Sequence, residues 1–575
     1  MPVPKPLLLS SLVCLSLLPG CVHTGQAPGA PGPAAAAADH LLEPAALRRD
    51  LRQLARLLDR SHPDPYRASG GRLAFHRKLH AIERAIPEQG LTAAGFLRRV
   101  RPLVAAVGDG HTTIRAPRAA ASGRRLWVEL DAASRRLFVS GVYARDDEIA
   151  LGGRVIAVAG VAFAALVRRQ QKLRGHDNAY NNLVHLMETL ASERGLAAIL
   201  GRAAPPERVP IRVATAGGGE RTIRAVVAAE APGELRTPPS RIALPPADAA
   251  GLGWGFMDAA HEVALLRIDS AMRYREAFEV WRACGFSHNL QAHLRQVARA
   301  AGGGRLPATR DAQIAAVPAA TETFGALFAA MRREQTSTLI VDLRRNSGGN
   351  SAIAGILAYH LYGEQGLRST AGGYQIPRLS TLYFENNSAL DREATLAERG
   401  IQLGDYDFSA ADRWSRAKES PPPAPADAKS PIEDYALLPT FHRALEAGAI
   451  TPYAPPRIIV LTAARTYSAG FDIAAALYKR GAEVIGVPSA QAGNCFIDSL
   501  AYELHHSHLT GSISYKRSLL FPDDPRTGEL LQPHIELTYE TWAAMRFDPN
   551  AAVTLALRSI RSLRELPDGD GLEKP

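Results

Sequence analysis

Two segments of this 575-residue chain repeat one plan, in which a short apolar run is followed by a tight turn and a helical pattern. The first segment, Thr338 to Gly363, reads "TLIVDLRRNSGGNSAIAGILAYHLYG", and the second, Arg457 to Gly481, reads "RIIVLTAARTYSAGFDIAAALYKRG". Continuous apolar runs of this length predict buried strands, and the spacing after each turn predicts a helix. Repeated strand–helix units predict an α/β fold with a mainly parallel sheet, whose functional groups gather at the carboxyl ends of its strands.

The chain is too long for a single core, so two to three domains are expected. Helical spacing predicts an N-terminal helical domain over residues 41–118, and short strands with one helical insertion predict a β domain over residues 119–235. The remaining boundaries are a linker at 236–252, the α/β domain at 253–565 with a proline-containing surface loop at 385–435, and a tail at 566–575.

The first residues, "MPVPKPLLLSSLVCLSLLPGC", have an early Lys5, an apolar region and small residues before Cys21. This pattern predicts a secretory signal over residues 1–21, and the Ala/Pro/Gly-rich residues 22–40 predict a flexible tether. "LPGC" also resembles the lipobox of bacterial lipoproteins, which implies a lipid on Cys21 and a membrane anchor in the cell envelope, in the outer membrane or the periplasm. An ordinary signal peptide with an incidental cysteine is the alternative, and the pairing of Cys284 with Cys495 stays open.

The formal net charge of +10 comes mostly from arginines scattered through helical segments. Such a distribution favours a solvated basic surface, and no nucleic-acid-binding motif accompanies it, so no nucleic-acid partner is predicted.

Three residues stand where the new helices expose unpaired N–H groups. Gly348 and Gly349 allow a sharp turn and a close approach to a ligand, and Ser468 occupies the corresponding position in the second unit. A serine nucleophile there would have the N–H of Ala469 beside it, and a glycine N–H would complete an oxyanion hole. In isolation, a serine at a helix start is more often an N-cap, and two glycines are more often a plain turn.

The segments "LIVDLRRNSGG" and "IIVLTAARTYSAGFDIAAAL", with "GVPS" after them, are similar to the catalytic core of the tail-specific or C-terminal-processing serine peptidases. That superfamily, serine-peptidase family forty-one, includes the tricorn core and retinoid-binding-protein repeats, and the resemblance extends over residues 45 to 560. It implies a crotonase-like (ClpP/crotonase) α/β core preceded by a PDZ-like β domain, of which "LGGRVIAVAGVAF" resembles a part. It implies no cofactor and polypeptide substrates.

The resemblance also implies a general base. One branch of the family places a lysine after the nucleophile's helix, but Ala492 holds that position in "GVPSAQAGN". The tricorn-core-like branch uses a histidine in a D-G-H-T context, which "GDGHTTI" matches at His111. The implied roles are Ser468 as nucleophile and His111 as base, with backbone donors at Gly349 and Ala469.

Two details of this assignment stay open, the second oxyanion donor and the orienting acid. Gly348 is an alternative oxyanion donor, and the acid that orients the histidine falls in "FPDDPRTGELLQPH", where the candidates are Asp523, Asp524 and Glu529. Asp342 is interpreted as structural, bonding the turn that follows it. The cluster His505 to His508 is not expected to bind a metal, because alternate residues of a strand face opposite sides.

The sequence therefore predicts an exported serine peptidase that cleaves extended polypeptides. A binding protein that kept the fold and lost turnover is the main alternative, because the loop "RRNSGG" has fewer glycines than its relatives and the third acid is not evident. An acyl-thioester enzyme is a third possibility, which export away from coenzyme A argues against.

Overall fold

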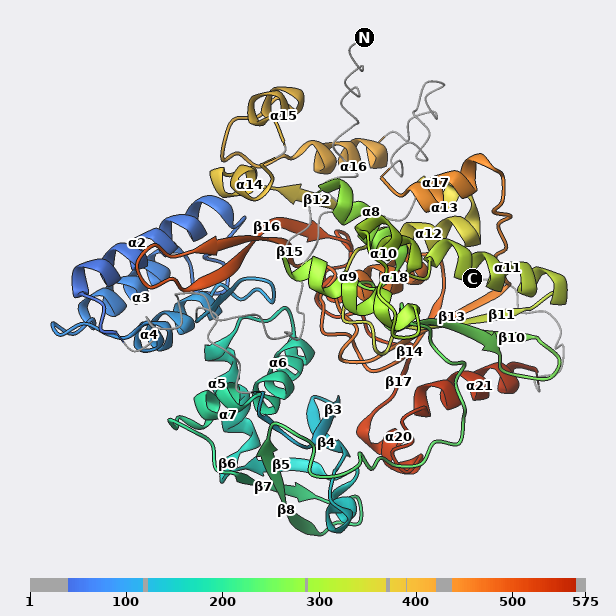
Figure 1. Cartoon of the computed structure of the whole chain (residues 1–575), viewed down its shortest axis with the longest axis horizontal. Coiled ribbons are helices and arrows are strands. Elements are labelled where there is room, and N and C mark those ends of the chain that lie inside the picture. Colours follow the sequence, from blue (N-terminus) through green and yellow to red (C-terminus); the bar gives the residue numbers. More distant parts are fainter. Residues whose placement is uncertain are drawn as a thin grey trace.

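The computed structural model describes residues 40–116, 123–284, 288–368, 373–388, 390–419 and 437–564 (Figure 1). The predicted signal peptide, the lipidation at Cys21 and the C-terminal tail lie outside these residues. So do most of the tether and the proline-rich part of the predicted loop at 385–435.

The central sheet has six strands in the order β17-β14-β13-β11-β10-β9. Their bounds are β9 Leu252–Phe256, β10 Val263–Ile268, β11 Thr338–Asp342, β13 Arg457–Thr462, β14 Glu483–Gly486 and β17 Ile535–Glu536. Every pair is parallel except β9 with β10. Because β11 and β13 are parallel neighbours, the glycine turn after one and Ser468 after the other lie at the same edge. The expected α/β fold is confirmed at this level.

Helices pack on both faces of this sheet. One face is covered by α8, α11, α12 and α18 around a core that includes Trp281, Phe324 and Phe328. The opposite face packs against the β domain and the C-terminal helices through residues such as Ile340, Ile459 and Trp542. These helices are α8 Arg275–Cys284, α11 Ala320–Glu334, α12 Ala352–Tyr362, α18 Ala469–Tyr478, α20 Tyr539–Ala544 and α21 Ala551–Arg564.

One helical stretch of the described residues, Arg310–Glu334, has the length and hydropathy of a membrane span. It contains α10 (Arg310–Ala316) and α11, and its residues Phe324, Leu327 and Phe328 are buried in the core of the α/β domain. Its hydropathy is therefore explained by packing in the core of the α/β domain.

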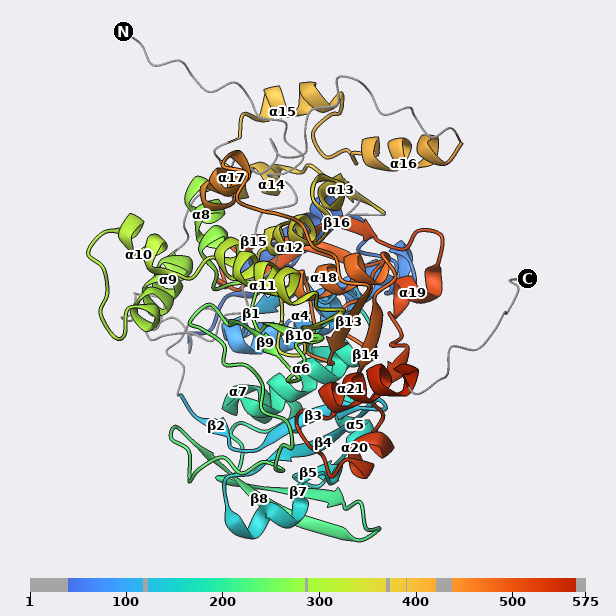
Figure 2. The same cartoon turned by 90° about the vertical axis from the view of Figure 1, so that its right-hand side faces the viewer.

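The β domain lies at the end of the molecule opposite α15 and α16 (Figures 1 and 2). Its seven strands are ordered β2-β8-β7-β5-β4-β3, and β6 pairs with β5. They are β2 Arg125–Leu126, β3 Glu129–Ala133, β4 Arg136–Gly141, β5 Arg154–Val158, β6 Val161–Ala162, β7 Arg208–Ala214 and β8 Glu220–Ala228. Its helices are η2 Arg145–Ala150, α5 Phe163–Leu173, α6 Ala179–Ala191 and α7 Glu193–Leu200, of which α6 and α7 are the predicted insertion.

The N-terminal helices share a core with the C-terminal half of the chain. Leu47, Phe96 and Val100 pack with Leu504 and Ile513. The elements involved are α2 Pro44–Ser61, α3 Arg72–Arg84, α4 Ala93–Ala105, α14 Thr381–Asn386, β15 Phe496–Glu503 and β16 Thr510–Leu519. β1 (Thr113–Arg115) then pairs antiparallel with β16, beside β15 and β12 (Tyr374–Pro377). This pairing carries the segment after His111 across to the α/β domain.

The region predicted as a surface loop, 385–435, contains the helices α15 and α16 in the part that the structure describes. α15 (Arg392–Arg399) begins because the Asp391 side chain accepts the N–H of Ala394, and it ends at Gly400 in a left-handed conformation. No residue of α15 is buried, so it does lie on the surface. The other connecting helices are α9 His288–Ala301, α13 Glu364–Arg368, α16 Ser409–Glu419, α17 Pro439–Glu446 and α19 Pro525–Glu529.

Candidate active site

Ser468 stands in a strained turn between β13 and α18. Its φ of 51° and ψ of −127° are values that a residue with a side chain rarely adopts. Although Ser468 precedes the first residue of α18, its side chain makes no capping hydrogen bond. Its own N–H donates to Oε1 of the buried Gln491 at 2.7 Å. The backbone is thus held in an unusual conformation while the hydroxyl is left out of the helix cap.

The glycine turn after β11 lies directly against this serine. A Cβ at Gly348, where φ is 108°, would lie 2.5 Å from Cβ and 3.1 Å from Oγ of Ser468. At Gly349, where φ is 143°, a Cβ would lie 2.2 Å from the carbonyl oxygen of Ala271. Both positions therefore require glycine, and the close approach brings the turn to the hydroxyl.

Two N–H groups at this edge have no recorded hydrogen-bond partner within the described residues, those of Gly349 and Ala469. The N–H of Gly348 is already used, because it donates to Oδ1 of Asn346 at 2.9 Å. Of the two glycines, Gly349 is therefore the one whose N–H is available to a ligand oxygen.

Asp342 stabilises the turn, as its sequence context indicated. Its Oδ1 accepts the backbone N–H of Arg344 at 3.1 Å and Nε of the same residue at 2.9 Å. Burial alone would raise the pKa of Asp342, but the guanidinium of Arg344 holds it below its usual range.

The loop that carries His111 is organised by the buried Asp109. Its Oδ2 accepts from Nε2 of His62 at 3.3 Å, from Oγ of Ser514 at 2.6 Å and from the Thr112 hydroxyl, and its Oδ1 accepts the N–H of His111 at 2.8 Å. Burial would raise the pKa of Asp109, but the bond from His62 and its neighbours lowers it below the usual range. One carboxylate thus joins the end of α2, the His111 loop and β16.

His111 reaches the serine's turn through Tyr467, the residue before Ser468. Nδ1 of His111 lies 3.1 Å from the hydroxyl of Tyr467, and the two rings stack with their centroids 5.1 Å apart. The same hydroxyl donates to Oδ2 of Asp177 at 2.8 Å, and Oδ1 of Asp177 accepts the N–H of Gly110 at 2.9 Å. These contacts form a continuous chain His111–Tyr467–Asp177, in which the histidine side chain is 2% exposed.

The direction of this chain follows from counting protons. A phenol has one proton, and here it goes to the carboxylate of Asp177, so the Tyr467 oxygen must accept from Nδ1 of His111. In the neutral ring, Nε2 is then the nitrogen with a free lone pair. Burial raises the pKa of Asp177 to about 6, partly opposed by its attraction to His111.

The structure brings four of the sequence-predicted residues to one edge of the sheet: Gly348, Gly349, Ser468 and Ala469. His111 is beside them, 356 residues before Tyr467 in the chain. In this structure it bonds Tyr467 and makes no recorded hydrogen bond to Ser468. The direct bond between base and nucleophile stays a prediction.

The candidate orienting acids lie elsewhere. Asp523, Asp524 and Glu529 are exposed, and Asp524 caps α19 by accepting from the N–H and hydroxyl of Thr527. The sequence argument missed Asp177, Tyr467 and Gln491. Tyr467 could have been predicted to take part, because it directly precedes Ser468. Asp177 lies before the helical insertion of the β domain, and no sequence motif around it indicates a role in the site.

Metal-ligating side chains gather at one place in the described residues, where ligand atoms of Asp109, His111 and Asp177 lie within 4.8 Å of one another. The carboxylate oxygens already accept the protein hydrogen bonds given above, which accounts for the cluster. His505 to His508 lie largely in the turn between β15 and β16 rather than in a strand as assumed. His506 accepts from Arg49 and His508 bonds Glu503, so the two histidines face different partners.

Comparison with known proteins gives the site a context. The fold is similar to two structures of mature CPAF. One has a TM-score of 0.52 at 14% identity, over 90% of this chain and 96% of that chain. The other, complexed with lactacystin, has a TM-score of 0.51 at 15% identity, over 89% and 99%. The photosystem II D1 C-terminal processing protease is a looser match, with a TM-score of 0.39 at 12% identity, over 86% and 94%.

No curated protein matched in a sequence comparison. The model of peptidase family S41 does match, over residues 312–497, a range that contains the glycine turn, Ser468 and Gln491. The match supports a peptidase function at the level of the family. Residues 312–497 of this chain are therefore similar in sequence to peptidase family S41.

Proposed function

We propose that this protein is an exported serine peptidase that hydrolyses peptide bonds of extended polypeptides through an acyl-enzyme on Ser468, with His111 as general base. The observation that carries the proposal is the hydrogen-bonded chain from the buried His111 through the half-buried Tyr467 and Asp177. It ends beside a serine whose backbone is strained and whose hydroxyl caps nothing. A helix start that needed only a cap would use none of these contacts.

In acylation, Nε2 of His111 takes the hydroxyl proton of Ser468 as Oγ attacks the peptide carbonyl carbon. The carbonyl oxygen becomes an anion and accepts the N–H groups of Gly349 and Ala469, each worth about 3–4 kcal/mol in comparable sites. The imidazolium then gives its proton to the departing amine. Water attacks the acyl-enzyme by the reverse proton path and restores the serine.

Asp177 takes the orienting role through Tyr467. Nδ1–H of His111 donates to the tyrosine oxygen, which fixes the tautomer that leaves Nε2 with a free lone pair to act as the base. The ionised Asp177 stabilises the imidazolium through the polarised phenol. Because His111 and Ser468 share no hydrogen bond here, substrate binding closes the remaining gap, as free enzymes often require.

The remaining parts of the proposal follow the sequence resemblances. The α/β domain is a crotonase-like core, and the seven-stranded domain is a PDZ-like module. The signal sequence exports the chain, and a lipid on Cys21 tethers it to the envelope.

The test is labelling by a serine-reactive fluorophosphonate. Wild type should be labelled, Ser468→Ala should not, and His111→Ala should be labelled several orders of magnitude more slowly while keeping its fold by circular dichroism. Lactacystin, present in one CPAF structure, is a second probe and should protect Ser468 from the label.

The converse results are equally informative. Equal labelling of wild type and Ser468→Ala would show that Ser468 is not the nucleophile. Absence of labelling in a folded wild type that still binds polypeptide would support the silent binding protein instead.

A further inference from the structure

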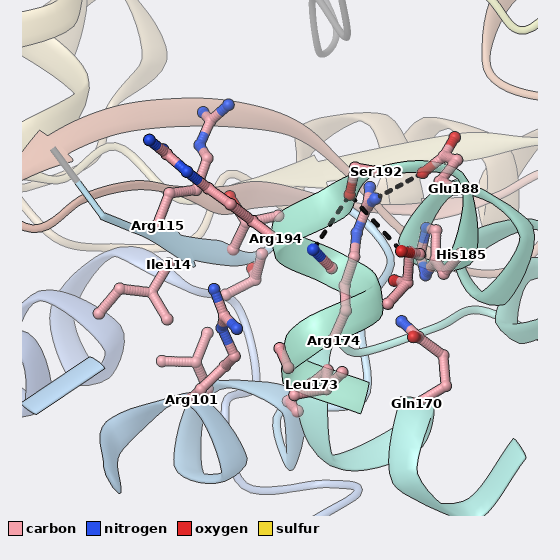
Figure 3. Close-up of a pocket in the computed structure, with 17 residues that line it drawn as sticks. Arg101, Ile114, Arg115, Gln170, Leu173, Arg174, His185, Glu188, Ser192 and Arg194 are labelled. Carbon is pink, nitrogen blue, oxygen red and sulfur yellow. Dashed lines mark hydrogen bonds and ion pairs between the residues drawn. The ribbon is translucent and has the colours of Figure 1, made fainter. Parts of the chain in front are cut away.

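A cavity of about 330 Å³ lies behind the His111 loop, between the N-terminal helices and the β domain (Figure 3). Its walls come from α4, from Thr112 and the strand β1 that follows it, and from the β-domain helices α5, α6 and α7. The volume falls at the lower end of the range for ligand sites in proteins. None of its lining residues belongs to the catalytic group proposed above.

The lining is strongly positive. Arg101, Arg115, Arg174 and Arg194 contribute four guanidinium groups, and Glu188 is the one acid among the lining residues. Glu188 is engaged with Arg174, whose Nη1 lies 3.2 Å from its Oε2. The wall therefore presents more positive charge than its own carboxylate balances, and Figure 3 shows the arginines arriving from different elements.

Arg101 is the residue that most clearly indicates an anionic ligand. Burial lowers the pKa of its guanidinium, and the described residues offer it no recorded hydrogen bond or ion pair. A charge withdrawn from water without a partner costs free energy, which a bound carboxylate would recover. Such an arrangement fits a ligand-binding residue better than a structural one.

Gln170 adds a second requirement. Its side chain is 1% exposed, it lines the same cavity, and its Oε1 has no hydrogen-bond partner among the described residues. A buried carbonyl oxygen needs a donor. The occupant must therefore carry an N–H or O–H group as well as negative charge.

We propose that this cavity is an exosite for an acidic segment of polypeptide, with a Glu or Asp carboxylate on Arg101 and Arg115 and a peptide N–H on Oε1 of Gln170. The proposal rests on the peptidase function for its substrate class. A polypeptide supplies both groups at once, whereas a bare inorganic anion supplies charge without a peptide donor. Arg115 and Arg194 are exposed, so they extend the positive wall outward from Arg101.

The cavity communicates with the catalytic loop. Nη2 of Arg174 donates to the carbonyl oxygen of Gly110 at 3.3 Å, and Thr112 and Thr113, directly after His111, are part of the cavity wall. A segment held there lies against the loop that carries His111. The expected effect is on substrate affinity, with KM rising and kcat little changed when the exosite is neutralised.

The experiment measures binding without turnover, on full-length Ser468→Ala. A fluorescein-labelled peptide of alternating Glu and Ala should raise the anisotropy, and a peptide with Gln in place of Glu should not. Adding Arg101→Gln should weaken binding about tenfold, the size expected for one lost charge-assisted hydrogen bond. The exposed Arg115→Gln should weaken it severalfold, and covers the case in which Arg101→Gln does not fold.

Arg98→Gln is the matched control, because Arg98 is exposed on the same helix α4 and does not line the cavity. Equal binding of the Glu and Gln peptides, or equal loss in Arg98→Gln and Arg101→Gln, would overturn the exosite. So would Arg101-dependent thermal stabilisation by inorganic phosphate with no peptide binding, which would indicate a small-anion site. Because the binding assay uses a variant without the serine, its result is independent of whether the phosphonate labels the wild type.

Discussion

Replacing Tyr467 by Phe tests the chain from His111 to Asp177 while keeping the aromatic ring. The change removes one oxygen, which accepts from Nδ1 of His111 at 3.1 Å and donates to Asp177 at 2.8 Å. The ring stacking on His111 stays possible, so the base should remain near its site but lose the group that fixes its tautomer.

The magnitude follows from the bonds lost. A hydrogen bond to a charged group contributes about 1.5–3 kcal/mol. If that much stabilisation of the imidazolium is lost in the transition state, kcat/KM should fall about 10- to 150-fold, at about 1.4 kcal/mol per factor of ten. Asp177 keeps the N–H of Gly110, so the cost in unfolding free energy should stay within about 1–3 kcal/mol.

The assay is kcat/KM on a fluorescently quenched, unfolded protein substrate, with unfolding by urea measured in parallel. Tyr478→Phe is the matched control, because Tyr478 lies in α18, its ring packs on Phe521 and His534, and no hydrogen bond of its hydroxyl is recorded in the described residues. Activity of Tyr467→Phe within twofold of wild type, or a loss no larger than in Tyr478→Phe, would refute the relay.

Three further outcomes are expected. Gly348→Ala should lower peptidase activity about hundredfold or more, because its Cβ would lie 2.5 Å from that of Ser468. Gly400→Ala, which has open space around it, is the control and should keep full activity. Equal activity of the two variants would show that the glycine turn does not position Ser468. Burial raises the pKa of Asp177 to about 6, so the folded protein keeps this carboxyl protonated up to a higher pH than the unfolded chain does. The free energy of unfolding should therefore fall as pH rises from about 4 to 6. Asp177→Asn should flatten that fall in urea unfolding by up to about 3 kcal/mol, and an unchanged profile would contradict the assignment. Cys21→Ser should move the exported protein from the membrane fraction to the soluble fraction. A wild-type protein found in the soluble fraction would contradict the predicted lipid on Cys21.

Local pattern was enough to predict the two strand–turn–helix units and the helical insertion of the β domain. In each case the information lies within about 25 neighbouring residues, as in the apolar run of β13 and the helical spacing of α18. The glycines at 348 and 349 were recognisable for the same reason, since a turn before a helix needs residues free to adopt positive φ.

Long-range contacts were not predictable in this way. Nothing in "GDGH" indicates that Asp109 would accept a hydrogen bond from Ser514, 405 residues away, or that β1 would pair with β16. The orienting acid was sought near the C-terminus by resemblance, whereas the carboxylate linked to His111 through Tyr467 is the half-buried Asp177 in the β domain. Any buried acid can play that part, and only the three-dimensional packing distinguishes one from another.

The pairing of β1 with β16 should itself be required for catalysis, because it holds the loop that carries the base. Gly511 stands opposite Ile114, and a Cβ there would lie 2.1 Å from the carbonyl oxygen of Thr113 and 2.6 Å from the ring of Tyr502. Gly511→Ala should therefore separate the strands, speed amide exchange at Thr113 to Arg115 and slow phosphonate labelling of Ser468 about hundredfold, since a displacement near 1 Å can cost that much. Gly217→Ala, which meets no atom within 4 Å, is the control. Faster exchange in β1 with undiminished labelling would mean that His111 is positioned independently of this strand.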